Sequence, residues 1–258
     1  MLNYSFPIKL ESTYLKFDDS VSVSAENNRQ LSDLKEVLSN QKGIDFDCTI
    51  YKMYRGVCKL EDKEKITEIR HDLTSIPAGV INGEFVKTYG HYHPKIGNLT
   101  YPEIYQIING KAIFILQDDI DNLKNVFFIF AQAPEIVIIP PNFGHVTINP
   151  SHDHLVLSNL IFNHLEPLYE PYQEKSGASY YITEGTPFAW SANKNYSNVP
   201  EPRFFQPNNP WGNQYLYDLS LNKPENLHFL SEPQNFNFAL EEIFIEKPIT
   251  EINNNLNL

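Results

Sequence analysis

The sequence has only two cysteines and no long uninterrupted run of apolar residues. Only Cys48 and Cys58 are cysteines, and we expect both to stay reduced in a chain without a visible export signal. No run of 18 apolar residues occurs, so we predict no transmembrane helix. The first residues lack a basic region followed by an apolar stretch, and we therefore predict a cytoplasmic location.

Positive charge is also scarce. The chain has 20 lysines and arginines against 32 aspartates and glutamates, which gives a formal net charge of -12. Because phosphate backbones attract basic surfaces through counterion release, we predict no nucleic-acid partner. A small phosphorylated ligand stays compatible with this charge, since a few local donors or a metal ion can hold one phosphate group.

Large apolar side chains are abundant, with 17 phenylalanines and 15 tyrosines in 258 residues. This is enough apolar surface to drive folding of one domain without cross-links. Short β-rich runs alternate with Pro, Gly, Asn and Asp, which is typical of a barrel or sandwich. We predict strands at residues 48–57, 68–76, 84–92, 104–108, 112–116, 126–130, 136–139, 145–148 and 155–162. Asn109-Gly110 between two of these runs predicts a tight hairpin, because both residues tolerate positive φ.

The flanks of the β-rich region differ from it in composition. We predict an N-terminal arm over residues 1–44 with one short helix near 30–38, where leucines recur at helical spacing. The barrel then occupies residues 45–183. Residues 184–258 form a C-terminal arm packed on the barrel, with short helical pieces near 224–230 and 239–244.

Two histidine pairs stand out in the sequence. His91 and His93 are separated by one residue, and the two-residue period of a strand puts both imidazoles on the same face. His152 and His154 have the same spacing, but one such pair is weak evidence by itself, and we expect these two to be a solvated pair.

The first histidine pair has two potential partners further along the chain. Glu103 opens the next strand, and His145 follows the Pro-rich turn at residues 140–144. In each strand, alternation allows the side chain to point into a common barrel interior. Three imidazoles and one carboxylate suit Fe(II), Mn(II), Ni(II) or Zn(II). We predict one divalent metal ion, with Fe(II) as first choice, bound by His91, His93, Glu103 and His145.

The order of these residues resembles the two cupin motifs: HxH, then Glu, six residues and Gly, then Pro, His, three residues and Asn. Residues 87–93, 101–105, 116–117 and 140–149 resemble the cupin-type glucose-6-phosphate isomerases of archaea and some bacteria. The similarity extends from about residue 51 to 181. It implies an all-β cupin fold, a small β-barrel or jelly roll with short helical and irregular arms. It also implies a metal-dependent aldose–ketose isomerase that interconverts glucose 6-phosphate and fructose 6-phosphate.

The resemblance also implies roles for single residues. The phosphate-binding residues of the family match Thr88, Gly90 and, by a looser alignment, Thr74. Tyr105 and Tyr169 match aromatic hydroxyls that line the sugar site. Thr88 and Gly90 alternate with the histidines, so they contact the same ligand only if the strand twists or bulges, or if Gly90 offers its backbone amide.

The sequence departs from the family pattern at two places. Nine residues separate His93 from Glu103, which is longer than the usual cupin gap, so a loop must bulge there. A tyrosine that some members use near the phosphate falls at Ile161 or Phe162. Lys87 has two interpretations, a phosphate-attracting cation or a solvated lysine at a strand edge.

The chemistry leaves alternatives open. Glu103 could act as general base, or a hydride shift could proceed without one, and Tyr105 could hold or protonate sugar oxygens. A cupin dioxygenase, a mannose-6-phosphate isomerase or epimerase, and a non-catalytic sugar-binding cupin are alternative functions, because fold does not decide activity. A sugar phosphate is the expected small-molecule partner. A homodimer is the expected assembly, since it is the commonest one.

Overall fold

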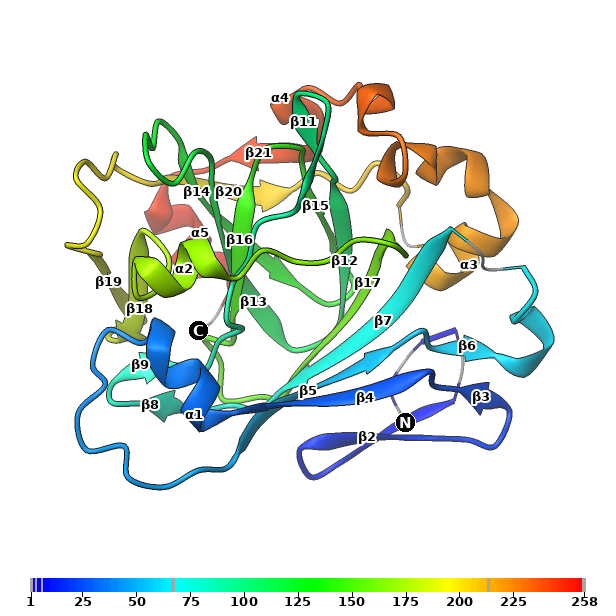
Figure 1. The fold of residues 1–258 in the computed structure, drawn as a ribbon, viewed down its shortest axis with the longest axis horizontal. Coiled ribbons are helices and arrows are strands. Elements are labelled where there is room, and N and C mark those ends of the chain that lie inside the picture. Colours follow the sequence, from blue (N-terminus) through cyan, green and yellow to red (C-terminus); the bar gives the residue numbers. More distant parts are fainter. Residues whose placement is uncertain (1, 3, 6, 66–67, 213, 257–258) are drawn as a thin grey trace.

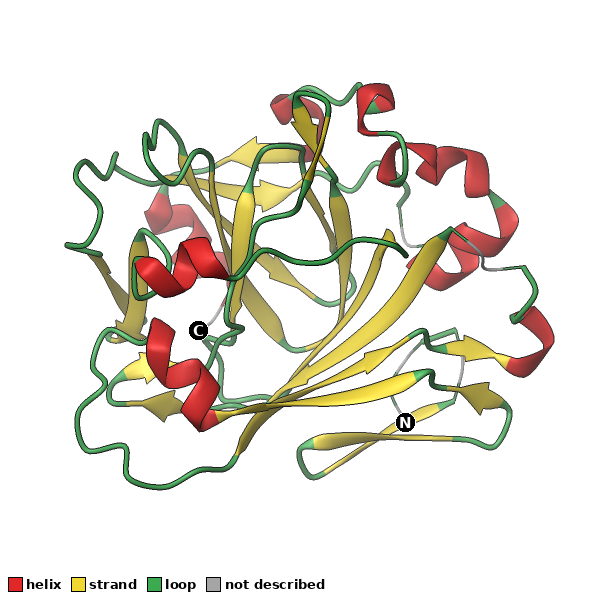
Figure 2. Cartoon of the chain, viewed as in Figure 1, coloured by secondary structure: helices red, strands yellow, loops and turns green. Residues whose placement is uncertain are grey.

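The structure is a computed structural model that describes residues 2, 4–5, 7–65, 68–212 and 214–256. Strands dominate it, and the helices are short (Figure 2). The α-helices are α1 (Leu31–Leu34), α2 (Glu170–Glu174), α3 (Leu216–Asn222), α4 (Leu240–Ile243) and α5 (Ile249–Leu256). The 3-10 helices are η1 (Lys35–Val37), η2 (Leu60–Asp62), η3 (Pro224–Leu230) and η4 (Pro233–Asn235).

Two large sheets form the body of the barrel (Figure 1). The six-stranded sheet has the order β15 (Ile136–Ile139), β12 (Glu103–Asn109), β17 (Leu155–Phe162), β7 (Ile69–Ile76), β5 (Thr49–Arg55) and β4 (Ala25–Gln30). The five-stranded sheet has the order β16 (Gly144–Ile148), β13 (Lys111–Gln117), β14 (Val126–Gln132), β20 (Arg203–Pro207) and β21 (Phe244–Glu246). Neighbouring strands are antiparallel except for β14 and β20.

Smaller sheets surround this body. One has the order β19 (Phe188–Ala192), β18 (Tyr180–Glu184), β9 (Glu84–Phe85) and β8 (Val80–Ile81). The two-stranded sheets are β1 (Ile8–Glu11) with β2 (Tyr14–Phe17), β3 (Val21–Ser22) with β6 (Cys58–Lys59), and β10 (Lys95–Ile96) with β11 (Leu99–Thr100).

The two faces of the six-stranded sheet bury different clusters, as the two-residue period requires. On one face, Met53 and Leu157 belong to the main core, together with most of the barrel. On the other face, Tyr54, Leu73 and Val156 pack with Ile8 and Leu15 of the N-terminal hairpin. Because both faces of this sheet are covered, its central strands are nearly continuous apolar runs, as β17 is with LVLSNLIF.

The predicted all-β cupin fold is confirmed. Predicted strands 136–139 and 155–162 coincide with β15 and β17, and most of the others agree within two residues. The predicted helix at 30–38 corresponds to α1 and η1, where Leu31, Leu34 and Leu38 are all buried. The helical piece at 224–230 is η3, and the piece at 239–244 is α4 followed by the start of β21.

The predicted hairpin at Asn109-Gly110 is wrong. β12 pairs with β15 and β17, whereas β13 pairs with β14 and β16, so the turn carries the chain from one large sheet to the other. Gly110 has φ +83°, and a Cβ there would lie 2.8 Å from the His154 carbonyl oxygen. The turn therefore requires glycine. Which strands pair with β12 and β13 depends instead on how distant segments bury their side chains against one another.

Both predicted arms contribute strands that the sequence patterns do not reveal. β4, with the polar sequence AENNRQ, pairs with β5 at the edge of the six-stranded sheet, and β20 pairs with β14. A mostly exposed edge strand needs no alternating apolar face, which removes the periodic signal. The three-part division at residues 44/45 and 183/184 stays a prediction. Residues 257 and 258 of the polar C-terminal tail lie outside the described residues.

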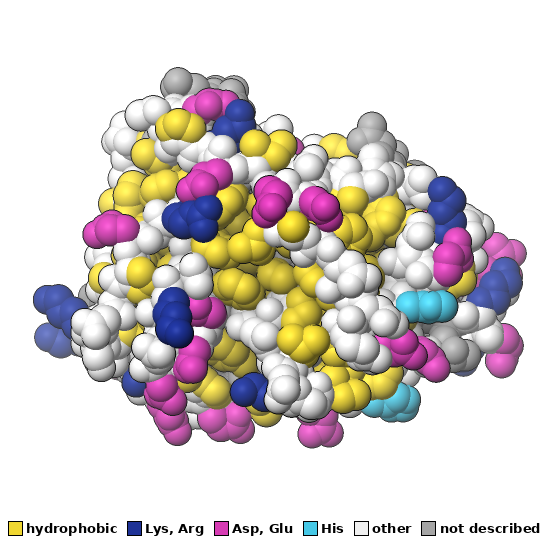
Figure 3. Space-filling view, turned by 90° about the horizontal axis from the view of Figure 1, so that it is seen from above, with side chains coloured by type: hydrophobic (Ala, Val, Ile, Leu, Met, Phe, Trp, Pro, Cys, Tyr) yellow, Lys and Arg dark blue, Asp and Glu magenta, His cyan; other side chains and the backbone are white. Residues whose placement is uncertain are grey.

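The surface agrees with the acidic composition. On the face in Figure 3, Lys and Arg side chains are scattered among acidic ones and form no continuous basic area. Cys48 is exposed, Cys58 is buried, and both are free thiols. Within the described ranges, no helix has both the length and the apolar character needed to cross a bilayer.

Candidate metal centre and substrate pocket

The four predicted metal ligands come from three separate segments. His91 and His93 lie between β9 and β10, Glu103 is the first residue of β12, and His145 lies in β16. His91 and His145 form an isolated antiparallel bridge, in which each backbone amide donates to the other residue's carbonyl at 3.1 and 3.0 Å. This backbone pairing places imidazoles from two distant segments side by side.

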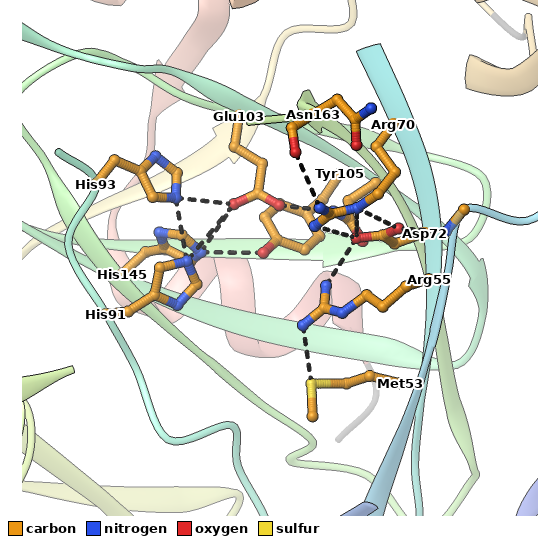
Figure 4. Close-up of polar contacts among 12 residues, drawn as sticks. Met53, Arg55, Arg70, Asp72, His91, His93, Glu103, Tyr105, His145 and Asn163 are labelled. Carbon is orange, nitrogen blue, oxygen red and sulfur yellow. Dashed lines mark hydrogen bonds and ion pairs between the residues drawn. The ribbon is translucent and has the colours of Figure 1, made fainter. Parts of the chain in front are cut away.

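The side chains converge on one point (Figure 4). One potential ligand atom from each of the four lies within 4.8 Å of all the others. Glu103 Oε2 is 3.3 Å from His93 Nε2, 3.5 Å from His145 Nε2 and 3.9 Å from His91 Nε2. Two ligands about 2.1 Å from a shared ion, at right angles to each other, lie about 3 Å apart. The spacing therefore suits one divalent ion.

Hydrogen bonds at the edge of the cluster orient two of the four side chains. His93 Nδ1 donates to the Tyr101 carbonyl at 2.7 Å, so Nε2 is the ring nitrogen that faces the cluster. Asn159 Nδ2 donates to Glu103 Oε1 at 2.7 Å, whereas the buried Glu103 Oε2 has no hydrogen-bond donor among the described residues. Such a buried acceptor is costly, and a divalent cation would satisfy it together with the ring nitrogens. These residues fit a metal ion.

The protonation states also suit metal binding. Burial lowers the pKa of His145 to about 4 and lowers the pKa of His91 well below its usual value. Burial raises the Glu103 pKa, but the adjoining His93 and His145 lower it by more, so the net shift is downward. Near neutral pH, His91 and His145 are neutral and Glu103 is ionised. Metal ligands need this state, because protons compete with the ion for the same atoms.

A pocket with about 560 Å³ of empty space, part of it open to solvent, adjoins the cluster. Alternate residues of four neighbouring strands form one wall, as expected when one sheet face points inward. The wall residues are Tyr51, Met53 and Arg55 of β5, Arg70 and Thr74 of β7, Leu157, Asn159 and Ile161 of β17, and Glu103 and Tyr105 of β12. Thr88, Gly90, His91, His145 and Tyr169 also line the pocket.

A family comparison agrees with this geometry. Residues 25–201, well over half of the chain, match the model of the family described as Glucose-6-phosphate isomerase (GPI). The chain belongs to the glucose-6-phosphate isomerase family. The family predicted from the sequence motifs is thereby confirmed.

Relatives in the glucose-6-phosphate isomerase family include archaeal proteins. The glucose-6-phosphate isomerase of Thermococcus litoralis is 29% identical over 141 residues, which cover 52% of this chain and 69% of the relative. That of Thermococcus onnurineus is 27% identical over 161 residues, covering 61% of this chain and 80% of the relative. A solved structure of Bacillus subtilis oxalate decarboxylase is 19% identical with a TM-score of 0.33. That match covers 44% of this chain and 26% of the decarboxylase chain.

The substrate residues implied by the glucose-6-phosphate isomerase resemblance all lie in the one pocket. Thr74, Thr88, Gly90, Tyr105 and Tyr169 line it together with three of the four potential metal ligands. The Tyr105 hydroxyl is 3.0 Å from His145 Nε2. The Tyr169 ring lies against His91, with ring centroids 5.6 Å apart. The structure brings these residues together, while their roles stay predictions.

The predicted strand at residues 84–92 is wrong as a continuous strand. β9 ends at Phe85, and single bridges follow at Lys87, His91 and Tyr92. Gly90 has φ +85°, which breaks the alternation and lets Thr88, Gly90 and His91 border the same pocket. A Cβ on Gly90 would lie 2.8 Å from the Tyr172 ring, so close packing also requires glycine there.

Both interpretations of Lys87 are wrong. Lys87 is buried, forms an ion pair with Glu84 and donates to the Val37 carbonyl at 2.7 Å. The side chain therefore neither faces solvent nor borders the pocket. The sequence around Lys87 gives no signal that this lysine and Glu84 pair in the interior, because the segment that holds them is irregular.

The second histidine pair lies apart from the metal ligands, as predicted, but only one of its members is fully solvated. His152 is exposed, whereas His154 is partly buried and its Nε2 lies 2.7 Å from Ser75 Oγ. Ile161, at the position of the family tyrosine, is buried in the pocket wall. It contributes no hydroxyl.

The sequence predictions assign no role to four polar residues that lie near the site: Arg55, Arg70, Asp72 and Asn159. Asn159 pairs in register with Tyr105 on one side and Asp72 on the other, within the apolar run LVLSNLIF. A polar residue inside such a run is the signal that could have found it, because a buried amide needs partners. The arginines gave no comparable signal, since arginine at a strand end is usually solvated.

Proposed function

We propose that this protein is a metal-dependent aldose–ketose isomerase that interconverts glucose 6-phosphate and fructose 6-phosphate. The observation that carries the proposal is the convergence of His91, His93, Glu103 and His145 at one end of a polar pocket, in a chain of the glucose-6-phosphate isomerase family. The names of the archaeal relatives support this substrate pair.

The four converging residues would hold one divalent ion, for which we propose Fe(II), with Mn(II), Ni(II) and Zn(II) as alternatives. Bound there, the ion would polarise the substrate carbonyl and its neighbouring hydroxyl. Asn159 fixes the Glu103 carboxylate through Oε1 and thereby keeps Oε2 directed at the cluster. Tyr101 orients the His93 ring in the same way.

Two side chains are placed to handle protons during isomerisation. Burial and the Glu103 charge raise the pKa of Tyr105 well above its usual value, so its hydroxyl stays protonated near neutral pH and can donate to a sugar oxygen. Glu103 is ionised and borders the pocket, so it is the candidate base for proton transfer between C1 and C2. Incorporation of solvent deuterium into the product would support this route, and complete retention would support a hydride shift.

A coupled assay with metal-stripped protein tests the proposal. Fructose 6-phosphate is supplied, glucose 6-phosphate is detected with its dehydrogenase, and Fe(II), Mn(II), Ni(II) and Zn(II) are titrated separately. We expect no turnover without metal and restored turnover with at least one ion at a stoichiometry of about one per chain. Absence of turnover with every ion, while the metal binds, would contradict the proposed activity.

Three further measurements on the metal-loaded protein separate the alternatives. Oxygen consumption without sugar-phosphate turnover would indicate a dioxygenase, and ligand-induced thermal stabilisation without product would indicate a sugar-binding cupin. Mannose 6-phosphate among the products would indicate a mannose-6-phosphate isomerase or epimerase. We also propose a homodimer located in the cytoplasm, which size-exclusion chromatography with light scattering and cell fractionation would test.

A further inference from the structure

A second polar cluster lies in the same pocket, away from the three imidazoles. Figure 4 shows Arg55 and Arg70 approaching Asp72, with Tyr105 between this group and the histidines. Arg55 Nη1 donates to Asp72 Oδ2 at 2.7 Å. Arg70 Nε and Nη2 donate to the same carboxylate at 2.9–3.0 Å, and the Gly56 amide adds a bond of 2.9 Å to Oδ1.

The cluster carries a net positive charge. Two guanidinium groups share one carboxylate, so one positive charge remains uncompensated within the group. Asp72 is fully buried, whereas the side chains of Arg55 and Arg70 are 26% and 23% exposed. Asp72 is therefore saturated with donors and holds both arginines in place, while the arginines themselves border the pocket.

Two N–H donor groups of this cluster have only weak hydrogen-bond acceptors. Arg55 Nη2 lies 3.2 Å from the Met53 sulfur, which is a weak acceptor, and has no oxygen acceptor within the described ranges. Arg70 Nη1 reaches the Asn163 carbonyl only at a long 3.4 Å. These N–H groups are free to form stronger bonds with an anionic oxygen that enters the pocket.

The separation between the two clusters suits a hexose phosphate. Tyr105, Asn159 and Asp72 lie in one row across the sheet, so β12 and β7 are two strands apart, or about 10 Å at the usual strand spacing. With bonds of about 1.5 Å, the phosphorus of an extended hexose 6-phosphate lies about 7 Å from C2. The arginine side chains extend inward from their strands, so their guanidinium groups lie closer to the metal ligands than the strand spacing alone would give.

We propose that Arg55 and Arg70 bind the phosphate group of the substrate and that Asp72 is the positioning residue that holds them. This deepens the proposed function and rests on it for the identity of the sugar. The neutral donors Thr74 and Thr88 line the same pocket, but the arginines alone among its described lining residues bring permanent positive charge. They make the site select phosphorylated over unphosphorylated sugars.

The test uses full-length, metal-loaded protein and two readouts, KM for fructose 6-phosphate and protection against thermal unfolding by inorganic phosphate. We expect R55Q to raise KM and the apparent Kd for phosphate by about tenfold or more, with unchanged metal content. R55K should recover part of the loss, because it restores the charge without the planar donor fork.

Two further variants control for indirect effects. R203Q removes an arginine that is paired through two nitrogens with Glu246 outside the pocket, and it should leave both readouts unchanged. If R55Q is unstable, R70Q replaces it as the test variant, because Asp72 then keeps its ion pair with Arg55. R70Q should likewise raise KM and weaken phosphate binding with unchanged metal content.

The outcomes separate this inference from the proposed function. Wild-type isomerase activity combined with unchanged KM and phosphate affinity in R55Q would overturn the arginine assignment and leave the function standing. Wild-type protein that turns over no sugar phosphate, but loses phosphate protection in R55Q, would support the anion site and overturn the proposed function. An equal loss of affinity in R203Q would overturn the assignment, because it would show a general effect of charge.

Discussion

At the scale of single residues, the site depends on which atom of each side chain is already engaged. Glu103 offers one oxygen to Asn159 and keeps the other free, and His93 donates from Nδ1 while Nε2 faces the cluster. These hydrogen bonds orient the side chains before an ion binds, which reduces the conformational entropy lost on binding. It also predicts which substitutions will remove the metal.

Glu103→Ala and His145→Ala should each abolish activity and reduce bound metal, because each removes one of four ligand side chains. Metal content measured by atomic absorption after chelator treatment, together with the coupled assay, checks this expectation. His152→Ala is the matched control, since His152 is exposed and outside the cluster. Equal metal content in all three variants would show that the ligand assignment is wrong.

Thr88→Val should raise the KM for fructose 6-phosphate more than it affects metal content, because Thr88 lines the pocket without belonging to the ligand cluster. Its Oγ1 also accepts a hydrogen bond of 2.9 Å from the Thr147 amide, so we expect a loss of about 1–3 kcal/mol in unfolding free energy. Thr88→Ser keeps the hydroxyl and should behave nearly as wild type. An unaltered KM in the valine variant would remove Thr88 from the substrate site.

At the scale of elements, the long gap between His93 and Glu103 is filled by the β10–β11 hairpin, which supplies the predicted bulge. This hairpin is tied to the turn before His145. The backbone amide of Thr100 donates to Asn142 Oδ1 at 3.1 Å, and the backbone amide of Asn142 donates to Thr100 Oγ1 at 2.6 Å. The reciprocal bonds link the segments that lead into Glu103 and His145, two of the proposed metal ligands.

Thr100→Val should therefore accelerate metal loss while leaving turnover at saturating metal close to wild type. The substitution removes the acceptor for the Asn142 amide and loosens the approach to Glu103 and His145 without touching a ligand. The rate of metal transfer to a chromogenic chelator measures the effect. Thr49→Val, at an exposed strand start, serves as control, and identical transfer rates for both variants would refute the linkage.

At the scale of the whole molecule, buried polar networks connect layers that the sequence separates widely. His71 in β7 donates from Nδ1 to the Val57 carbonyl at 2.7 Å, and its Nε2 contacts Tyr4 and Ser158 at 2.8 and 3.0 Å. Burial lowers the pKa of His71 to about 4. An unfolded histidine titrates near 6.5, so the unfolded state binds protons at a higher pH than the folded state.

The folded protein should consequently lose stability as the pH falls from about 6.5 towards 4, with the His71 contribution fully present above this window. The pKa difference corresponds to about 3 kcal/mol. Urea unfolding of metal-free protein at several pH values measures it. His71→Gln should be less stable than wild type at pH 7 but should show a shallower decline on acidification. Parallel declines for the two proteins would exclude His71 as a source of acid sensitivity.

The local pattern of the sequence determined the class of fold and identified the four residues that we propose as metal ligands. The two-residue period relates His91 to His93 within a short segment, and the motif order relates them to Glu103 and His145. Apolar runs bounded by turn residues marked most strands of the barrel, because burial of β-rich segments leaves a signal in each segment by itself. The short helix at 30–38 was predictable for the same reason.

Only the tertiary structure decided which strands are neighbours and what the pocket wall contains. The Asn109-Gly110 turn connects two sheets instead of closing a hairpin, Lys87 finds Glu84 in the interior, and Arg55 meets Arg70 and Asp72 across adjacent strands. Strand pairing and buried charge depend on contacts between residues far apart in the chain. The free energy of such contacts depends on register and on exclusion of water, and neither quantity is encoded in any single stretch of sequence.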